Sequence, residues 1–285
     1  HQSLDSYVFP ASIRVVQVAG WGRPTLKGIK YQNNHFLPSY RIIVTIEGDK
    51  TVVFPSAISS ISDDTLFFNL KHYQEVETGV QHRNLLDQAP VQNLVQSIVL
   101  ENEILETAYI SKIKPLIQSV SDQLVVSSHS PVVLGAYDSL GNFTGVNQNQ
   151  DLSAEFLTIS EGIPGSAFLY TAESQYIFLP KNGTYTFVYK GINTGPTTVE
   201  VEEFKNEVTT PVAIYPDIPT TSATEATFVI DSSVLQGTII EIDTNNDDVP
   251  DTYVAPDGGS LTLEQLLVNL RTYVRDMEIE DKLKQ

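Results

Sequence analysis

Residues 119–206 consist of short runs rich in β-branched and aromatic side chains, each closed by Gly, Pro, Asn or Asp. About seven such runs at intervals of roughly 8–12 residues are typical of an antiparallel β-sandwich. Side chains alternate in character within residues 184–189, which predicts one buried face and one solvated face. We therefore expect a sandwich domain over residues 116–206. Its expected strands are residues 124–126, 132–137, 154–160, 166–170, 175–179, 183–190 and 197–204.

The composition restricts the possible partners and the chemistry. The 285 residues carry a formal net charge of −18 and include no cysteine. The acidic excess argues against a nucleic-acid partner, because phosphate groups would be repelled. Without cysteine there is no disulfide, thiolate metal site or cysteine nucleophile. This composition fits a secreted or cell-surface prokaryotic protein, although cytosolic proteins can also lack cysteine. No apolar run reaches the ~18 residues of a membrane span, so we expect no transmembrane segment.

Upstream of the sandwich, residues 13–110 follow the order strand, acid, strand, histidine, helix. The β-branched run at 13–22 predicts a buried strand of a parallel sheet. The apolar run at 40–46 leads to Asp49, and the carboxyl end of a strand is where open α/β sheets place functional groups. His82 follows the next apolar run, and Pro90 then opens a segment with helical spacing of its apolar residues.

Three motifs match a known family in this order: residues 18–25, residues 48–52 with 56–57, and residues 79–86. On them, residues 13–110 resemble the C-terminal half of an α/β-hydrolase of the lecithin:cholesterol acyltransferase and bacterial lipase type. The resemblance implies that Asp49 orients His82, and that His82 takes a proton from a serine hydroxyl and returns it to the leaving group. The family's acid motif usually reads Gly-Asp-Gly-Thr-Val, whereas this chain has Lys50 at the third position. A lysine there adds a cation beside the acid and favours an ordinary backbone angle.

The resemblance leaves the nucleophile unassigned within this chain. Ser166 and Ser260 lack the Gly-x-Ser-x-Gly pattern and the strand-to-helix setting of a nucleophile elbow. Half of a parallel sheet would also expose an apolar edge. We therefore expect the serine to come from an upstream segment or from a partner polypeptide that carries the N-terminal half of the hydrolase domain.

Residues 207–259 are expected to form a small β module that contains an acidic loop. Oxygen donors at alternate positions match positions 1, 3, 5 and 9 of a calcium loop, although the sixth and twelfth positions do not match. These candidate Ca²⁺ ligands are Asp243, Asn245, Asp247 and Asp251. The alternative is an acidic hairpin turn without a metal. Leucines at i, i+3, i+4 and i+7 then predict a helix within residues 260–285.

The sequence thus predicts a multidomain fold of mixed α/β and all-β class. Its expected parts are half of an α/β-hydrolase domain at 1–115, the β-sandwich at 116–206, the small β module at 207–259 and the C-terminal helix at 260–285. The expected function is the acid-and-base-bearing portion of an extracellular serine ester hydrolase that acts on ester or lipid substrates without an organic cofactor. Two alternatives stay open: a surface, structural or adhesive protein that self-assembles, and a carbohydrate-binding module that targets a lipase to a cell wall.

Overall fold

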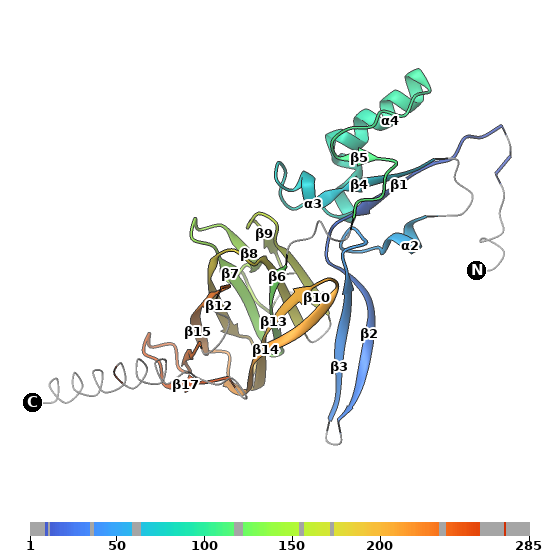
Figure 1. The fold of residues 1–285 in the computed structure, drawn as a ribbon. Helices are drawn as coiled ribbons and strands as arrows, with labels where there is room; N and C mark the ends of the chain where they lie inside the picture. The colour runs from blue at the N-terminus through green and yellow to red at the C-terminus, as the bar shows by residue number, and fades with distance from the viewer. Residues whose placement is uncertain are drawn as a thin grey trace, which may run out of the picture.

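The fold is β-rich and mostly antiparallel in the computed structural model of the chain (Figure 1). The structure describes residues 9–10, 12–34, 37–58, 64–116, 122–153, 157–171, 174–233, 238–256 and 271. The prediction of a β-rich fold is confirmed. The expected C-terminal helix lies outside the described residues, apart from Arg271.

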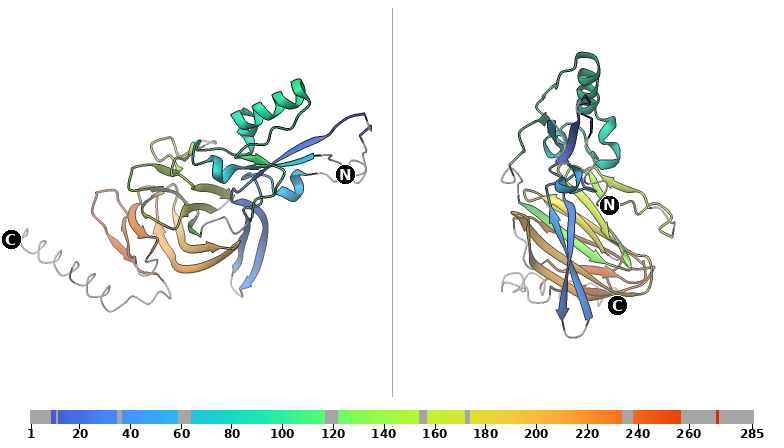
Figure 2. Two further views of the ribbon diagram at one scale, coloured as in Figure 1. Left: turned by 45° about the horizontal axis from the view of Figure 1, so that its top comes forward. Right: turned by 90° about the vertical axis from the view of Figure 1, so that its right-hand side faces the viewer.

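Two antiparallel sheets pack face to face as a sandwich (Figures 1 and 2). In the described part of the chain, one sheet has five strands in the order β10-β11-β6-β13-β14 and the other has seven in the order β17-β16-β15-β12-β7-β8-β9. The strands of the five-stranded sheet are β6 (Gln123–His129), β10 (Ala167–Thr171), β11 (Ser174–Pro180), β13 (Gly195–Lys205) and β14 (Val208–Thr220). Those of the seven-stranded sheet are β7 (Val132–Tyr137), β8 (Phe143–Val146), β9 (Ile159–Glu161), β12 (Thr184–Gly191), β15 (Glu225–Asp231), β16 (Ile240–Asp243) and β17 (Thr252–Val254).

The core of the sandwich explains why these segments form strands. Phe187, Tyr189 and their neighbours on alternate positions of β12 are buried, while the residues between them are partly exposed. Phe187 stacks on Phe228 of β15 with a centroid distance of 5.2 Å. Strands β12 and β15 thus bury one row of side chains, which is the alternation that the sequence displays at 184–189, whereas β6 and β11 are buried on both faces.

The described strands within residues 207–259 extend the two sheets of the sandwich. Strand β14 pairs along β13 in the five-stranded sheet, and β15 pairs with β12 in the seven-stranded sheet. Ala213 and Tyr215 of β14 are buried in the common core. The boundary expected at residue 206 therefore does not separate two sheets, because the strands beyond it extend both layers of the sandwich.

A small sheet lies beside the sandwich and carries the helices. Among the described strands, β1 (Val16–Trp21) and β4 (Asp64–Asn69) form the one parallel pair, and β5 (Ile110–Ser111) adds an antiparallel edge. The helices are α2 (Phe54–Ala57), α3 (Leu70–Tyr73), η1 (His82–Asp87) and α4 (Ala89–Glu101). Pro90 occupies the first turn of α4, and Asn102 ends this helix in a left-handed conformation with φ 56°. No helix in the described ranges has both the length and the apolar character needed to cross a membrane.

The apolar run at 40–46 lies mostly in a hairpin rather than in the parallel sheet. Strand β3 (Leu37–Thr45) pairs antiparallel with β2 (Thr25–Asn34), and this hairpin extends beside the sandwich (Figures 1 and 2). Val44 and Ile46 pack on the outer face of the five-stranded sheet, against a cluster that includes Phe178. This packing brings the turn that follows Ile46 to the junction between the small sheet and the sandwich.

Candidate active site

Asp49 and His82 are in direct contact. The Nδ1 atom of His82 lies 2.7 Å from Oδ2 of Asp49, and the backbone N–H of His82 donates to the carbonyl of Asp49 at 3.0 Å. A carboxylate only accepts hydrogen bonds, so the Nδ1 atom carries the proton and donates it. The ring's other nitrogen, Nε2, is then left as the acceptor that a general base needs.

A tight turn holds the Asp49 carboxylate in place. Its other oxygen, Oδ1, accepts the backbone N–H groups of Thr51 at 3.2 Å and Val52 at 2.8 Å. Asp49 is 4% exposed and lies against Gly20 of β1, where an added Cβ atom would stand 2.5 Å from the Cβ of Asp49. Gly20 is therefore required for the close approach of the turn at residues 49–52, called the acid turn below, to strand β1.

The loop after α3 presents His82 at the start of η1. Gln81 and Asn84 exchange side-chain and backbone hydrogen bonds in a capping box that fixes the start of this short helix. Buried Leu85 anchors the helix on the small sheet. The His82 side chain is 50% exposed although its partner carboxylate is buried. Asp49 and His82, called the dyad below, therefore combine a carboxylate that is held in place with an imidazole that a substrate can reach.

The described residues do not provide a serine nucleophile that is hydrogen-bonded to His82. In the ranges that the structure describes, no serine hydroxyl hydrogen-bonds to the His82 ring. Ser166 lies in the sandwich, where its hydroxyl pairs with Thr144 at 2.7 Å and its carbonyl accepts from Arg23. Ser260 lies outside the described residues.

Lys50 adopts a backbone angle that favours glycine. Its φ is 83°, whereas we expected an ordinary angle from the lysine side chain. For a residue with a Cβ atom this conformation costs roughly 1–2 kcal/mol. The side chain compensates by an ion pair, because its Nζ atom lies 2.7 Å from Oε1 of Glu161 and the side chain is 13% exposed.

Glu161 of β9 also pairs with a second buried cation. Its Oε2 atom lies 2.7 Å from Nη2 of Arg23, and Arg23 is 1% exposed. The Nη1 atom of Arg23 donates to the side chain of Gln74 and to the carbonyl of Ser166. Burial lowers the pKa of both Arg23 and Lys50, and the charge of Glu161 opposes this lowering. One carboxylate thus forms an ion pair with each of two cations that flank the acid turn.

Sequence reasoning did not identify Glu161. It stands in a loop-like stretch of Ser, Gly and Pro, and no local pattern marks it. Lys50 was visible as a departure from the family motif, and Arg23 as part of the motif at 18–25, but their common partner is 111 and 138 residues away in the chain. Pairing across such separations is a property of the tertiary structure.

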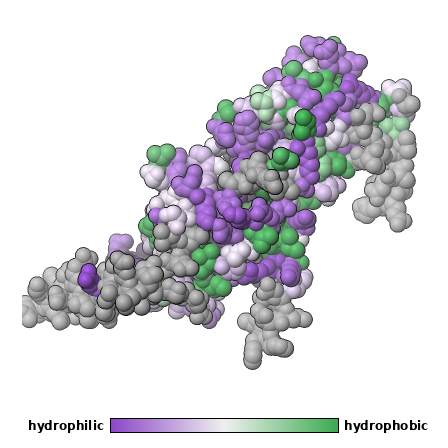
Figure 3. All heavy atoms as spheres, in the orientation of Figure 1, coloured by the Kyte–Doolittle hydropathy of each residue, from purple (hydrophilic) through white to green (hydrophobic). Residues whose placement is uncertain are grey.

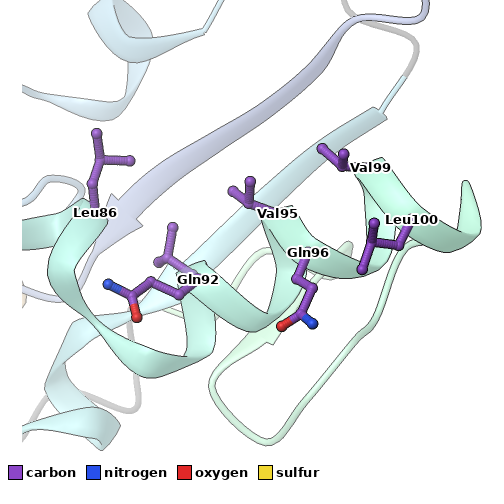
Figure 4. A pocket seen from close by; sticks show the side chains of 7 residues that line it. Leu86, Gln92, Val95, Gln96, Val99 and Leu100 are labelled. Atoms are coloured by element: carbon purple, nitrogen blue, oxygen red, sulfur yellow. The ribbon is translucent and has the colours of Figure 1, made fainter.

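An apolar groove lies along α4, close to His82 in the chain (Figure 4). Its volume is about 530 Å³, and the residues labelled in Figure 4 line it: Leu86, Gln92, Val95, Gln96, Val99 and Leu100. Leu86, Val95 and Val99 project to the same side and are 73%, 49% and 73% exposed. Hydrophobic patches also interrupt the hydrophilic surface of the molecule in Figure 3. Isolated exposed aliphatic residues are common, but a continuous row on one helix face is typical of a contact surface.

The predicted calcium ligands lie on an exposed turn between β16 and β17. Asp243 accepts the backbone N–H groups of Asn245, Asn246 and Asp248, and Asp251 accepts the backbone N–H and the side-chain hydroxyl of Thr244. Asp247 accepts from Val249. In the described part of the chain, no three His, Cys, Asp or Glu side chains gather as a metal site. These oxygens are therefore engaged with the loop itself.

Calcium binding by this turn stays a prediction. If it holds, about 1 mM Ca²⁺ raises the midpoint of thermal unfolding by a few degrees, and EGTA reverses the rise. Asp243→Asn should abolish the effect, whereas Asp231→Asn, in a similar turn with Ser233, should retain it. An unchanged midpoint for the wild-type protein would contradict the prediction.

Comparisons with family models, with curated proteins and with solved structures find no match for this chain. The case for a function therefore rests on the site's own geometry.

Proposed function

We propose that this chain is the acid-and-base-bearing portion of an extracellular prokaryotic serine ester hydrolase of lipase or esterase type. In this proposal Asp49 and His82 belong to an α/β-hydrolase domain, and a serine from an upstream segment or a partner polypeptide is the nucleophile. The observation that carries the proposal is the 2.7 Å contact between a buried carboxylate and a half-exposed imidazole.

The geometry supports the two roles that the proposal assigns. Asp49 fixes the tautomer of His82 and stabilises the imidazolium that forms when the ring accepts a proton. With Nδ1 engaged, His82 takes the proton of the serine hydroxyl at Nε2, while the serine oxygen attacks the ester carbonyl. It then returns the proton to the departing alkoxide. A water molecule repeats the sequence to release the acid and restore the serine.

The surface of the small sheet supports a partner that completes the domain. Strand β1 stands at the end of the described sheet, and parallel strands usually have both faces covered. The groove along α4 offers exposed Val95, Val99 and Leu100 to the same partner. We propose that the upstream strands, with the helix that follows the serine, pack on these surfaces.

The experiment that tests the proposal labels the source preparation with a fluorophosphonate probe and examines the native complex by mass spectrometry. We expect a labelled companion polypeptide in a stoichiometric complex with this chain. In a reconstituted complex, His82→Ala should slow the labelling at least about 100-fold, because the serine loses its base. His72→Ala is the matched control: this ring packs against Tyr109 and is separate from the dyad.

An unlabelled chain that is found alone, or only with copies of itself, would contradict the enzyme proposal. That result would favour the alternative of a non-catalytic surface, structural or adhesive protein.

A further inference from the structure

The acid turn is tied to the sandwich on both sides of Asp49. Lys50, the residue after the acid, forms its ion pair with Glu161 at 2.7 Å. On the other side, the backbone N–H of Arg23 donates at 3.1 Å to the carbonyl of Gly48, the residue before the acid. The side chain of the same Arg23 then reaches Glu161 at 2.7 Å. A single carboxylate therefore anchors the backbone that precedes and follows Asp49.

Glu161 is itself held rigidly by the sandwich. Its Oε1 atom accepts the backbone N–H of Phe168 in β10 at 2.6 Å, and its side chain is 4% exposed. Phe168 belongs to the sandwich core. The carboxylate thus has a fixed position, set by the residues that join the two sheets of the sandwich.

The conformation of Lys50 shows that this anchor acts on the turn. A residue with a Cβ atom persists at φ 83° only where its surroundings enforce that angle. The backbone N–H of Lys50 donates to Thr25 Oγ1 at 2.9 Å, and the buried ion pair fixes the other end of the residue. Without the charge of Glu161, two buried cations would face each other beside the turn, and their repulsion and desolvation would displace it.

We propose that Glu161 is a positioning residue for the Asp49–His82 dyad, so that the sandwich is a structural part of the candidate active site and not an independent appended module. This inference rests on the proposed function for the role of the dyad. The effect of Glu161 on the hydrogen bond between Asp49 and His82, however, can be tested without any measurement of hydrolysis.

The test compares the tautomer of His82 in the full-length chain and in Glu161→Gln, read from the ¹⁵N shifts of the ring at about pH 9, where imidazole rings are neutral. In the wild type we expect mainly the Nδ1-protonated form, because Asp49 accepts that proton. In Glu161→Gln we expect the Nδ1-protonated fraction to fall at least about twofold, because the hydrogen bond that selects the tautomer is lost. The absence of the signals in His82→Gln assigns them.

Glu225→Gln is the matched control, because it removes a partly exposed ion pair with Lys190 at 2.6 Å from the same sandwich. Its His82 tautomer should equal that of the wild type. A Glu161→Gln protein that keeps the far-ultraviolet circular dichroism of the wild type and also keeps its tautomer would overturn the inference. If Glu161→Gln does not fold, Lys50→Met is examined by the same measurement of the His82 tautomer, because it removes one ion pair of Glu161 and leaves the pair of Arg23 and Glu161 intact. A lower Nδ1-protonated fraction would then support the inference, and an unchanged fraction would overturn it.

The two proposals fail in different ways. An unlabelled complex with a tautomer that depends on Glu161 would contradict the enzyme proposal alone. A labelled complex with a tautomer that is indifferent to Glu161 would contradict the positioning role alone.

Discussion

If the chain belongs to the proposed hydrolase, Asp49→Asn is expected to lower ester hydrolysis by the reconstituted complex about 10⁴-fold while the chain stays folded. The asparagine keeps Oδ1, so it retains the hydrogen bonds from the N–H groups of Thr51 and Val52 that shape the turn. Its amide NH₂ takes the place of Oδ2 and donates to Nδ1 of His82. The ring is then protonated at Nε2 and cannot accept the proton of a serine. Steady-state hydrolysis of a short-chain ester by the reconstituted complex measures the loss.

Asp64→Asn is the control for this substitution. Asp64 begins β4, at the far end of the strand from the site, and pairs with Arg14 at 2.7 Å and Lys112 at 2.6 Å. Its replacement removes a carboxylate from the same small sheet, but we expect activity within about twofold of the wild type. If Asp49→Asn keeps the activity of Asp64→Asn, Asp49 does not orient the base.

Glu202→Gln is expected to stabilise the protein above neutral pH. Glu202 lies on the outer face of β13 beneath the β2–β3 hairpin and is 5% exposed. Burial and the nearby charge of Glu200 raise its pKa from 4.5 to about 7, and Arg41 at 3.7 Å only partly opposes them. An ionised carboxylate is therefore unfavourable in this position.

The sign of the pH dependence follows from proton uptake. Between pH 4.5 and about 7 the folded state binds more protons at Glu202 than the unfolded state does, so this group makes stability fall as pH rises through that window. Each unit by which the pKa is higher in the folded state lowers the free energy of unfolding at high pH by about 1.4 kcal/mol. Ionisation of Glu202 therefore lowers the free energy of unfolding at pH 8 by on the order of 3 kcal/mol. Urea unfolding followed by circular dichroism between about pH 4 and pH 8 measures this dependence. Glutamine cannot ionise and should remove it.

Glu203→Gln provides the comparison on the same strand. Glu203 pairs with Lys181, and both side chains are partly exposed, at 29% and 28%. Such a pair contributes roughly 0–1 kcal/mol, and its loss should not stabilise the protein at high pH. Parallel pH profiles for Glu202→Gln and the wild type would show that Glu202 does not titrate as its burial implies.

Local patterns in the sequence predicted most of the separate elements. The alternation at 184–189 reappears in β12, and Pro90 begins the helix that its position indicates. The turn at 138–141 likewise depends on neighbouring residues, because Asp138 accepts backbone N–H groups of Leu140 and Asn142 and Gly141 adopts φ 82°. These features depend on residues that are close in the chain, so they can be recognised without the fold.

The sequence was less informative where a residue's surroundings come from distant segments. Strand β8 was not expected, since the run at 143–146 is short and includes Gly145, whose φ is 140°. The β module expected at 207–259 illustrates the same point: the sequence predicts β structure there, but not that β14 and β15 pair with β13 and β12. Strand pairing is nonlocal and leaves no signature within a single strand.

The candidate site shows both situations. The order of acid, histidine and helix in the sequence singled out Asp49 and His82, and the structure brings the two side chains together. The sequence by itself thus determined many of the strands and turns, and which two polar residues are candidates for an acid and a base. Only the tertiary structure decided how the sheets are paired, why Lys50 occupies a glycine position and which carboxylate holds the acid turn. The reason is physical: backbone periodicity acts over a few neighbouring residues, whereas burial and ion pairing depend on groups such as Arg23 and Glu161, which are 138 residues apart.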